Sequence, residues 1–185
     1  MPSKSLYMYN YFSVGVDAQV ALDFHRTRES RLYLFSSRIF NKLLYLCFGT
    51  QQVVTADCKN IQERERVDLY LDGKLTPLPE LESIVVLNIQ LWGTGVNLWN
   101  MRGDSSTQSY KDGVLEVVGI YSSFNIAQLL VGLSTPHKIG QAKTIEIHLK
   151  ATAPLQVDGE PWEQTPAIFK ISLVDQAVVL VNKKN

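Results

Sequence analysis

The sequence has few cysteines, no long hydrophobic run and no excess of either charge. Only Cys47 and Cys58 occur among 185 residues, which is too few for a disulfide framework and favours a reducing compartment. No apolar run approaches the roughly 18 residues of a membrane span. A signal-peptide pattern and an Asn-x-Ser/Thr sequon are also missing. These absences exclude a membrane-spanning protein, give secretion no support and predict a cytoplasmic location.

The charge balance limits the possible partners. The 18 Lys and Arg residues equal the 18 Asp and Glu residues, so the formal net charge is zero. A nucleic-acid partner is therefore not expected, because binding to phosphate backbones requires a basic surface. With 45% apolar residues, the chain can bury one core, and we expect residues 1–185 to form a single domain.

Several common catalytic frameworks are missing as well. The chain contains no Gly-x-x-x-x-Gly-Lys-Ser/Thr loop, no Gly-x-Gly-x-x-Gly, no Gly-x-Ser-x-Gly and no Cys-x-x-Cys. His25, His137 and His148 are far apart in the sequence and have no second ligand type at metal-site spacing. We therefore assign the histidines no role.

The spacing of apolar residues predicts an α+β fold that is mostly β. Two helices are expected near the N-terminus, at residues 17–29 and 39–48, after a buried strand at residues 6–16. From about residue 52 onward the apolar period falls from near four to two, which is typical of strands with one buried face. We expect such strands around residues 67–71, 145–149 and 169–173, more deeply buried strands at residues 84–89 and 114–120, and a short helix at residues 124–131.

Asp-Gly, a common hairpin-turn dipeptide, occurs at Asp72, Asp112 and Asp158. The simplest interpretation is three turns. At the third turn, however, Asp158 and Glu160 place two carboxylates two residues apart, where they could face one cleft. Such a pair suits phosphoryl transfer, in which one carboxylate accepts a hydroxyl proton and the other supports a magnesium-bound nucleotide.

The residues around this turn resemble the accessory, C-terminal lobe of the diacylglycerol kinases. The strongest segment is Val157-Asp158-Gly159-Glu160-Pro161-Trp162. Other stretches follow in the family's order: Asn10-Tyr11-Phe12-Ser13-Val14-Gly15-Val16-Asp17-Ala18, Phe24-His25, Ser36-Ser37-Arg38-Ile39, Val86-Leu87-Asn88-Ile89, Asn97-Leu98-Trp99, Asp112-Gly113-x-Leu115-Glu116 and Ile139-Gly140-Gln141-Ala142. The likeness extends over residues 7–181 and is greatest to the epsilon type, which the resemblance links to arachidonoyl-containing diacylglycerol.

The resemblance implies a fold, an activity and partners. The fold is the sandwich-like second lobe of the lipid kinases. The activity is transfer of a phosphoryl group from ATP, with Mg²⁺, to the 3-hydroxyl of diacylglycerol at a membrane surface, giving phosphatidic acid. Asp158 resembles the general base, and Glu160 the residue that supports nucleotide phosphate or magnesium. The family's Gly-Gly-Asp-Gly-Thr nucleotide-binding motif is missing here, so the resemblance implies an N-terminal nucleotide-binding lobe as partner and a chain that is inactive alone.

Two further residues have competing interpretations. Asp17 stands where a related lipid kinase family places an acidic residue facing the lipid head group, but an Asp at the start of a helix also serves as an N-cap. Asp112 resembles a loop where bacterial relatives hold a structural magnesium, and it also fits a plain hairpin.

Three functional hypotheses remain open from the sequence. The first is a lobe of an ATP-dependent diacylglycerol kinase. The second is a catalytically silent lipid-binding or interaction module of the same fold. The third is a structural β-rich domain in which Asp158 and Glu160 only form a turn and its flank.

Overall fold

Two antiparallel sheets form the frame of the computed structural model, which describes residues 4–30, 67–93, 95–101 and 107–178. The larger sheet has the strand order β6-β5-β4-β1-β8-β9 and the smaller one β10-β7-β2-β3. The strands of the larger sheet are β1 Tyr11–Gly15, β4 Ser83–Leu87, β5 Leu115–Ile120, β6 His137–Ala142, β8 Ala153–Val157 and β9 Glu160–Gln164. Those of the smaller sheet are β2 Val67–Leu71, β3 Lys74–Thr76, β7 Thr144–Leu149 and β10 Ala167–Ser172.

The main core lies between the two sheets. Phe12, Val14 and Leu155 of the larger sheet are buried in one cluster with Leu69 and Ile147 of the smaller sheet. Since side chains alternate between the faces of a strand, this arrangement accounts for the period of two in β2, β7 and β10. The α+β, mostly β and sandwich-like fold expected from the sequence is confirmed.

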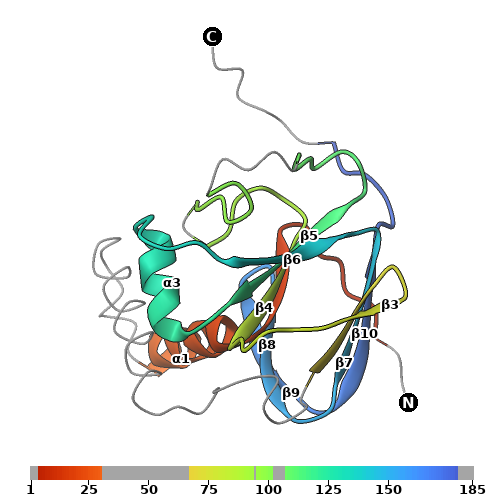
Figure 1. Ribbon diagram of the computed structural model, residues 1–185. Helices are drawn as coiled ribbons and strands as arrows, with labels where there is room; N and C mark the ends of the chain where they lie inside the picture. Colours follow the sequence, from red (N-terminus) through yellow and green to blue (C-terminus); the bar gives the residue numbers. More distant parts are fainter. Residues whose placement is uncertain (1–3, 31–66, 94, 102–106, 179–185) are drawn as a thin grey trace.

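The other face of the larger sheet carries the helices. Helices α1, Val16–Ser30, and α3, Ser123–Leu130, lie on the same side of this sheet (Figure 1). A second buried cluster forms there and includes Val85 and Val118 from the sheet and Ile126 and Leu129 from α3. Strands β4 and β5 are therefore buried along their whole length, as their continuous apolar sequence predicts.

The predicted helices have different outcomes. The helix expected at residues 17–29 is confirmed as α1, and the one expected at 124–131 as α3, whose N-cap Ser122 accepts a hydrogen bond from the Asn125 N–H at 3.1 Å. The helix expected at 39–48 lies outside the described residues. Neither described helix has the length and hydrophobicity that crossing a membrane requires.

The observed strands differ from the predictions both in their bounds and in their number. The strand expected at residues 6–16 spans only Tyr11–Gly15, because α1 already begins at Val16. Strands β3, β6, β8 and β9 were given no bounds from the sequence, although the turn between β8 and β9 was predicted. In β8 and β9, Pro154 and Pro161 interrupt the apolar pattern. Both prolines fit the topology, since β9 is an edge strand and the pairing of β1 with β8 covers only Leu155 to Val157.

One glycine in β5 is required by close packing. A Cβ on Gly119 would lie 2.4 Å from Cδ1 of Leu81, a side chain that is itself fully buried. We therefore expect Gly119→Ala to lower the free energy of unfolding by about 1–3 kcal/mol, the usual cost of overpacking. Urea denaturation measures this change. In the double variant with Leu81→Ala, the Gly119→Ala substitution should cost less unfolding free energy than it does alone. If the costs of the two substitutions are strictly additive, the proposed clash is wrong.

Candidate functional site

Asp158 occupies the tight turn that joins β8 to β9. The two turn residues, Asp158 and Gly159, have φ angles of 53° and 88°. Positive φ at both central residues is the mark of the two-residue hairpin turn that Asp-Gly favours. The turn predicted from the sequence is therefore confirmed at this position.

The Asp158 carboxylate binds the backbone that leads into β1. Its Oδ2 accepts a hydrogen bond from the N–H of Tyr9 at 2.8 Å, and its Oδ1 accepts from the N–H groups of Asn10 and Tyr11 at 2.7 and 3.0 Å. The Asp158 N–H in turn donates to the Tyr11 carbonyl at 2.9 Å. Each carboxylate oxygen has two lone pairs, so Oδ2 keeps one acceptor position. Asp158 therefore anchors the chain, and its Oδ2 can accept one further hydrogen bond.

The Glu160 and Gln156 side chains lie on opposite faces of the larger sheet. Glu160 pairs directly with Val157, whose side chain packs toward the core between the sheets. Residues directly opposite in an antiparallel pair share a face, so exposed Glu160 lies on that face, whereas Gln156 points toward the helices. Among the described residues, no hydrogen bond joins Asp158 to Glu160, and the partners of the Asp158 carboxylate are the N–H groups of Tyr9, Asn10 and Tyr11.

Asp17 is completely buried, with 0% of its surface exposed. Its Oδ1 contacts the Ser83 hydroxyl from β4, and its Oδ2 accepts a hydrogen bond from Gln156 Nε2 of β8 at 3.0 Å. Because α1 begins at Val16, Asp17 lies inside the first turn and the N-cap prediction is wrong. A contact with a lipid head group would require this buried environment to open.

Burial also changes the acidity of this region. It raises the pKa of the Asp17 carboxyl, and hydrogen bonds, including those with Ser83 and Gln156, oppose the shift. Burial, followed by the charges of Asp17 and Asp158, raises the pKa of Tyr11 to about 12. The Tyr11 phenol therefore remains a hydrogen-bond donor at neutral pH and lies within electrostatic reach of both carboxylates.

Asp112 forms a local turn. Its exposed carboxylate accepts a hydrogen bond from the Val114 N–H at 3.0 Å. The expected hairpin is not formed, because the strands that pair with β5 are β4 and β6 and the described residues 107–111 contain no strand. Among the described residues, no group of three or more His, Cys, Asp or Glu is arranged to hold a metal ion.

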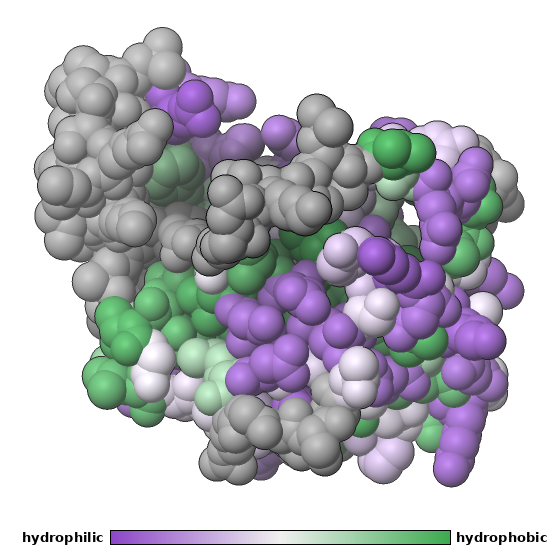
Figure 2. All heavy atoms as spheres, turned by 90° about the horizontal axis from the view of Figure 1, so that it is seen from above, coloured by the Kyte–Doolittle hydropathy of each residue, from purple (hydrophilic) through white to green (hydrophobic). Residues whose placement is uncertain are grey.

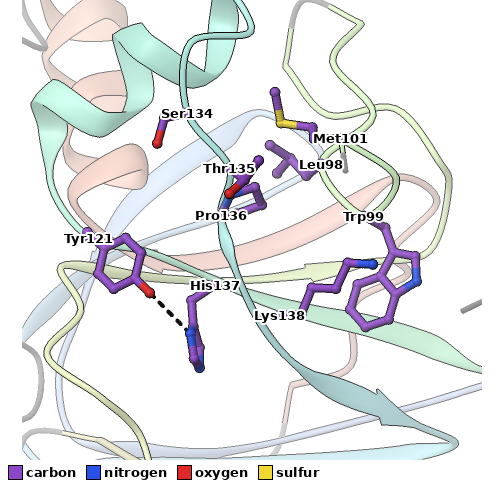
Figure 3. Close-up of a pocket in the computed structure, with 9 residues that line it drawn as sticks. All are labelled: Leu98, Trp99, Met101, Tyr121, Ser134, Thr135, Pro136, His137 and Lys138. Atoms are coloured by element: carbon purple, nitrogen blue, oxygen red, sulfur yellow. Dashed lines mark hydrogen bonds between the residues drawn. The ribbon is translucent and has the colours of Figure 1, made fainter. Parts of the chain in front are cut away.

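A separate pocket of about 490 Å³ lies near α3 and contains none of the four predicted site residues (Figure 3). It lies between the segment around Leu98 and the start of β6, where Tyr121 Oη and His137 Nδ1 are 3.2 Å apart. Sequence reasoning gave His137 no role. Ser83 and Gln156, which surround Asp17, were also not identified as site residues, because no local pattern marks a contact between residues 139 positions apart.

A known protein-family model matches most of this chain. The family model described as diacylglycerol kinase accessory domain matches residues 7–161. The chain belongs to this family. Among its relatives, "Probable diacylglycerol kinase 3" of Caenorhabditis elegans is 35% identical over 195 residues, covering 93% of this chain and 24% of the relative. Human "Diacylglycerol kinase theta" is 34% identical over 184 residues, covering 98% of this chain and 19% of the relative.

The accessory-domain chain thus spans a quarter or less of the length of these diacylglycerol kinases. "Diacylglycerol kinase eta" of Drosophila mojavensis is 38% identical over 173 residues, covering 89% of this chain and 9% of the relative. These theta and eta relatives support the diacylglycerol kinase family and do not support the epsilon type. Among solved structures, "A putative diacylglycerol kinase from Bacillus anthracis str. Sterne" is 16% identical with a TM-score of 0.46, covering 89% of this chain and 50% of that one.

Proposed function

We propose that this chain is the accessory lobe of an ATP-dependent diacylglycerol kinase, which produces phosphatidic acid once a nucleotide-binding lobe completes the site. The observation that carries the proposal is the family match over residues 7–161, which includes the turn at Asp158 and Glu160. The names of the relatives supply the substrate class.

Asp158 is the proposed general base. The free acceptor position on its Oδ2 takes the proton of the diacylglycerol 3-hydroxyl while the hydroxyl oxygen attacks the γ-phosphorus of ATP. The bond between that phosphorus and the bridging oxygen breaks, and ADP leaves. A base needs to lie only within hydrogen-bond reach of the hydroxyl, and the remaining bonds of Asp158 to Asn10 and Tyr11 fix its orientation.

Glu160 is the proposed contact to nucleotide-bound magnesium. Mg²⁺ is commonly held by one or two carboxylates together with substrate phosphates and water, so a single exposed carboxylate fits this role, although the described residues offer no complete metal cage. Magnesium supplies charge neutralisation at the phosphates. Asp112 remains a proposed ligand for a second, structural cation, which would need main-chain carbonyls as additional ligands.

The proposal predicts that phosphate transfer requires both lobes. Labelled ATP and diacylglycerol in mixed micelles should give labelled phosphatidic acid when the full chain is mixed with a separately expressed nucleotide-binding lobe. The chain alone should give none. A folded chain that gives no product even with the second lobe present would contradict the kinase proposal.

The second candidate is the catalytically silent lipid-binding or interaction module. The three backbone hydrogen bonds that occupy Asp158 favour it, since they give the carboxylate a structural role that needs no substrate. The finer hypothesis of an epsilon-type preference for arachidonoyl chains rests on sequence resemblance alone.

A further inference from the structure

Tyr11 of β1 stands directly opposite Asp158. The register of β1 and β8 pairs Phe12 with Val157, so the next position along β1 faces the turn. Two hydrogen bonds join the residues there: the Asp158 N–H donates to the Tyr11 carbonyl at 2.9 Å, and the Tyr11 N–H donates to Asp158 Oδ1 at 3.0 Å. Residues directly opposite in an antiparallel pair have Cβ atoms about 5 Å apart. The Tyr11 side chain therefore starts beside the proposed general base.

The Tyr11 side chain lies on the helix-facing side of the larger sheet. Phe12 and Val14 are buried in the core between the sheets, and side chains alternate along a strand, so Tyr11 points the other way. There it packs against the second buried cluster and stays partly exposed. It also lies within electrostatic reach of Asp158 and of buried Asp17. Packing therefore holds the ring next to two acidic side chains.

The Tyr11 hydroxyl has no hydrogen-bond partner within residues 4–30, 67–93, 95–101 and 107–178. A tyrosine hydroxyl that is mostly removed from water usually has such a partner. Because burial and the two carboxyl groups raise the pKa of Tyr11 to about 12, the phenol keeps its proton at neutral pH and can donate it in a hydrogen bond. The hydroxyl is therefore available to an oxygen atom of a ligand.

The charge of the neighbourhood decides which ligand oxygen suits this donor. A phosphate oxygen carries negative charge and is repelled by a nearby carboxylate, whereas the carbonyl oxygen of an ester is neutral. In 1,2-diacylglycerol, the carbon with the reacting 3-hydroxyl is bonded directly to the carbon with the 2-acyl ester. An acceptor on Asp158 and a donor on Tyr11 therefore match two neighbouring groups of this lipid.

We propose that the Tyr11 hydroxyl donates a hydrogen bond to the carbonyl oxygen of the 2-acyl ester of diacylglycerol, while Asp158 accepts one from the 3-hydroxyl. This inference rests on the proposed function and deepens it, because it makes Tyr11 a specificity-determining residue. A site that donates to a carbonyl discriminates against an analogue without one, since the donor is then left unpaired.

A lipid without the 2-carbonyl tests this role in the two-lobe assay. In 1-acyl-2-alkylglycerol an ether replaces the ester, and Tyr11→Phe removes only the hydroxyl from the protein. The variant should lower kcat/KM for diacylglycerol about fivefold, the usual effect of one hydrogen bond, and leave kcat/KM for the ether lipid unchanged. The preference of the protein for the ester over the ether should therefore fall about fivefold in the variant.

Tyr70→Phe is the matched control. Tyr70 is also a partly exposed tyrosine in a strand, but it lies in β2 of the smaller sheet, where its ring centre is 4.8 Å from that of His148. Figure 2 shows mostly hydrophilic side chains on the side of the molecule where the smaller sheet lies in Figure 1. Tyr70→Phe should leave kcat/KM for both lipids unchanged. Urea denaturation should show that Tyr11→Phe is as stable as the original chain.

A binding measurement gives the same comparison without turnover. Short-chain forms of the ester and ether lipids can be titrated into the assembled lobes by isothermal titration calorimetry. Tyr11→Phe should weaken binding of the ester lipid about fivefold and leave binding of the ether lipid unchanged.

Two outcomes would overturn the role of Tyr11. The variant could keep the full preference for the ester lipid, or it could lose activity and binding equally with both lipids, which would separate the hydroxyl from the 2-carbonyl. In both cases phosphate transfer by the original chain would leave the proposed function intact. If the original chain with the second lobe transfers no phosphate, the proposed function fails, and the binding comparison still decides whether Tyr11 recognises the ester.

Discussion

Asp158→Asn is expected to lower phosphate transfer at least a hundredfold when both lobes are present. The amide cannot accept the hydroxyl proton, and a positioned general base typically contributes a factor of about 10²–10⁴ in rate. The turn itself should survive, because Asn adopts the positive φ of 53° more readily than most residues. The labelled-ATP assay measures the rate, and urea denaturation measures the stability of the same variant.

The substitution also disturbs the anchor of β1. An Asn oxygen can still accept from Asn10 and Tyr11, but the amide nitrogen then faces the Tyr9 N–H in place of Oδ2. We expect a loss of about 1–3 kcal/mol in unfolding free energy, the usual cost of one lost polar contact. A loss of this size leaves a domain of this length folded, so the rate can be compared in folded protein.

Asp72 offers a matched control for the anchoring role. It also precedes a glycine in a two-residue turn, has a φ of 48°, and its Oδ1 accepts from the N–H groups of Lys143 and Thr144 at 3.0 and 2.9 Å. Bonding to Thr144 is the largest cause that lowers the pKa of its carboxyl. Asp72→Asn should therefore weaken a similar anchor in the smaller sheet and leave phosphate transfer unchanged.

The comparison of the two variants decides between the functional hypotheses. If Asp158→Asn loses stability but keeps near-normal transfer, Asp158 is an anchor like Asp72 and the general-base role is wrong. If both variants lose transfer in proportion to their stability, the loss reflects folding and not chemistry. Only a selective loss of rate at Asp158 supports the proposed base.

Local sequence patterns were sufficient to predict about half of the strands in the two sheets. A strand that is buried on one face has alternating apolar residues, and this pattern identified β2, β7 and β10. A strand that is buried on both faces has a continuous apolar sequence, and this pattern identified β4 and β5. Strands β8 and β9 left no such trace. Their prolines and polar residues are compatible with a strand only in view of which neighbours each one pairs with.

The candidate site was only partly predictable for the same reason. The Asp158 turn follows from a dipeptide, but the bonds of its carboxylate to Tyr9, Asn10 and Tyr11 connect residues almost 150 positions apart. The burial of Asp17 depends on β4 and β8 lying on either side of β1. No local pattern encodes strand order, so an Asp at a helix start resembled an N-cap.

Asp17→Asn is expected to leave the protein at least as stable as the original at neutral pH. The Ser83 hydroxyl lies 2.9 Å from the Val14 carbonyl and also contacts Asp17 Oδ1. Burial disfavours the charged form of the carboxyl and raises its pKa, and a neutral amide avoids that cost. The Asn side chain can donate from Nδ2 to the Ser83 hydroxyl oxygen and still accept through its own oxygen from Gln156 Nε2.

The pH dependence has a definite sign. Because the pKa of Asp17 is higher in the folded than in the unfolded protein, the folded state binds the proton more tightly, and stability is lost as pH rises from the unfolded pKa toward the folded one. The Asn variant lacks this dependence. The unfolding free energy of the Asn variant minus that of the original protein should therefore increase as the pH rises from 4 to 8. Urea denaturation at several pH values measures this difference.

Asp17→Leu is the matched comparison, because it keeps the number and branching of the side-chain heavy atoms and removes both polar functions. Gln156 Nε2 then loses its acceptor inside the core, which should cost about 1–3 kcal/mol in unfolding free energy. The same variants test the lipid-contact hypothesis in the two-lobe assay. If Asp17 binds the head group as a carboxylate, Asp17→Asn should raise the KM for diacylglycerol, whereas a purely internal role leaves that KM unchanged.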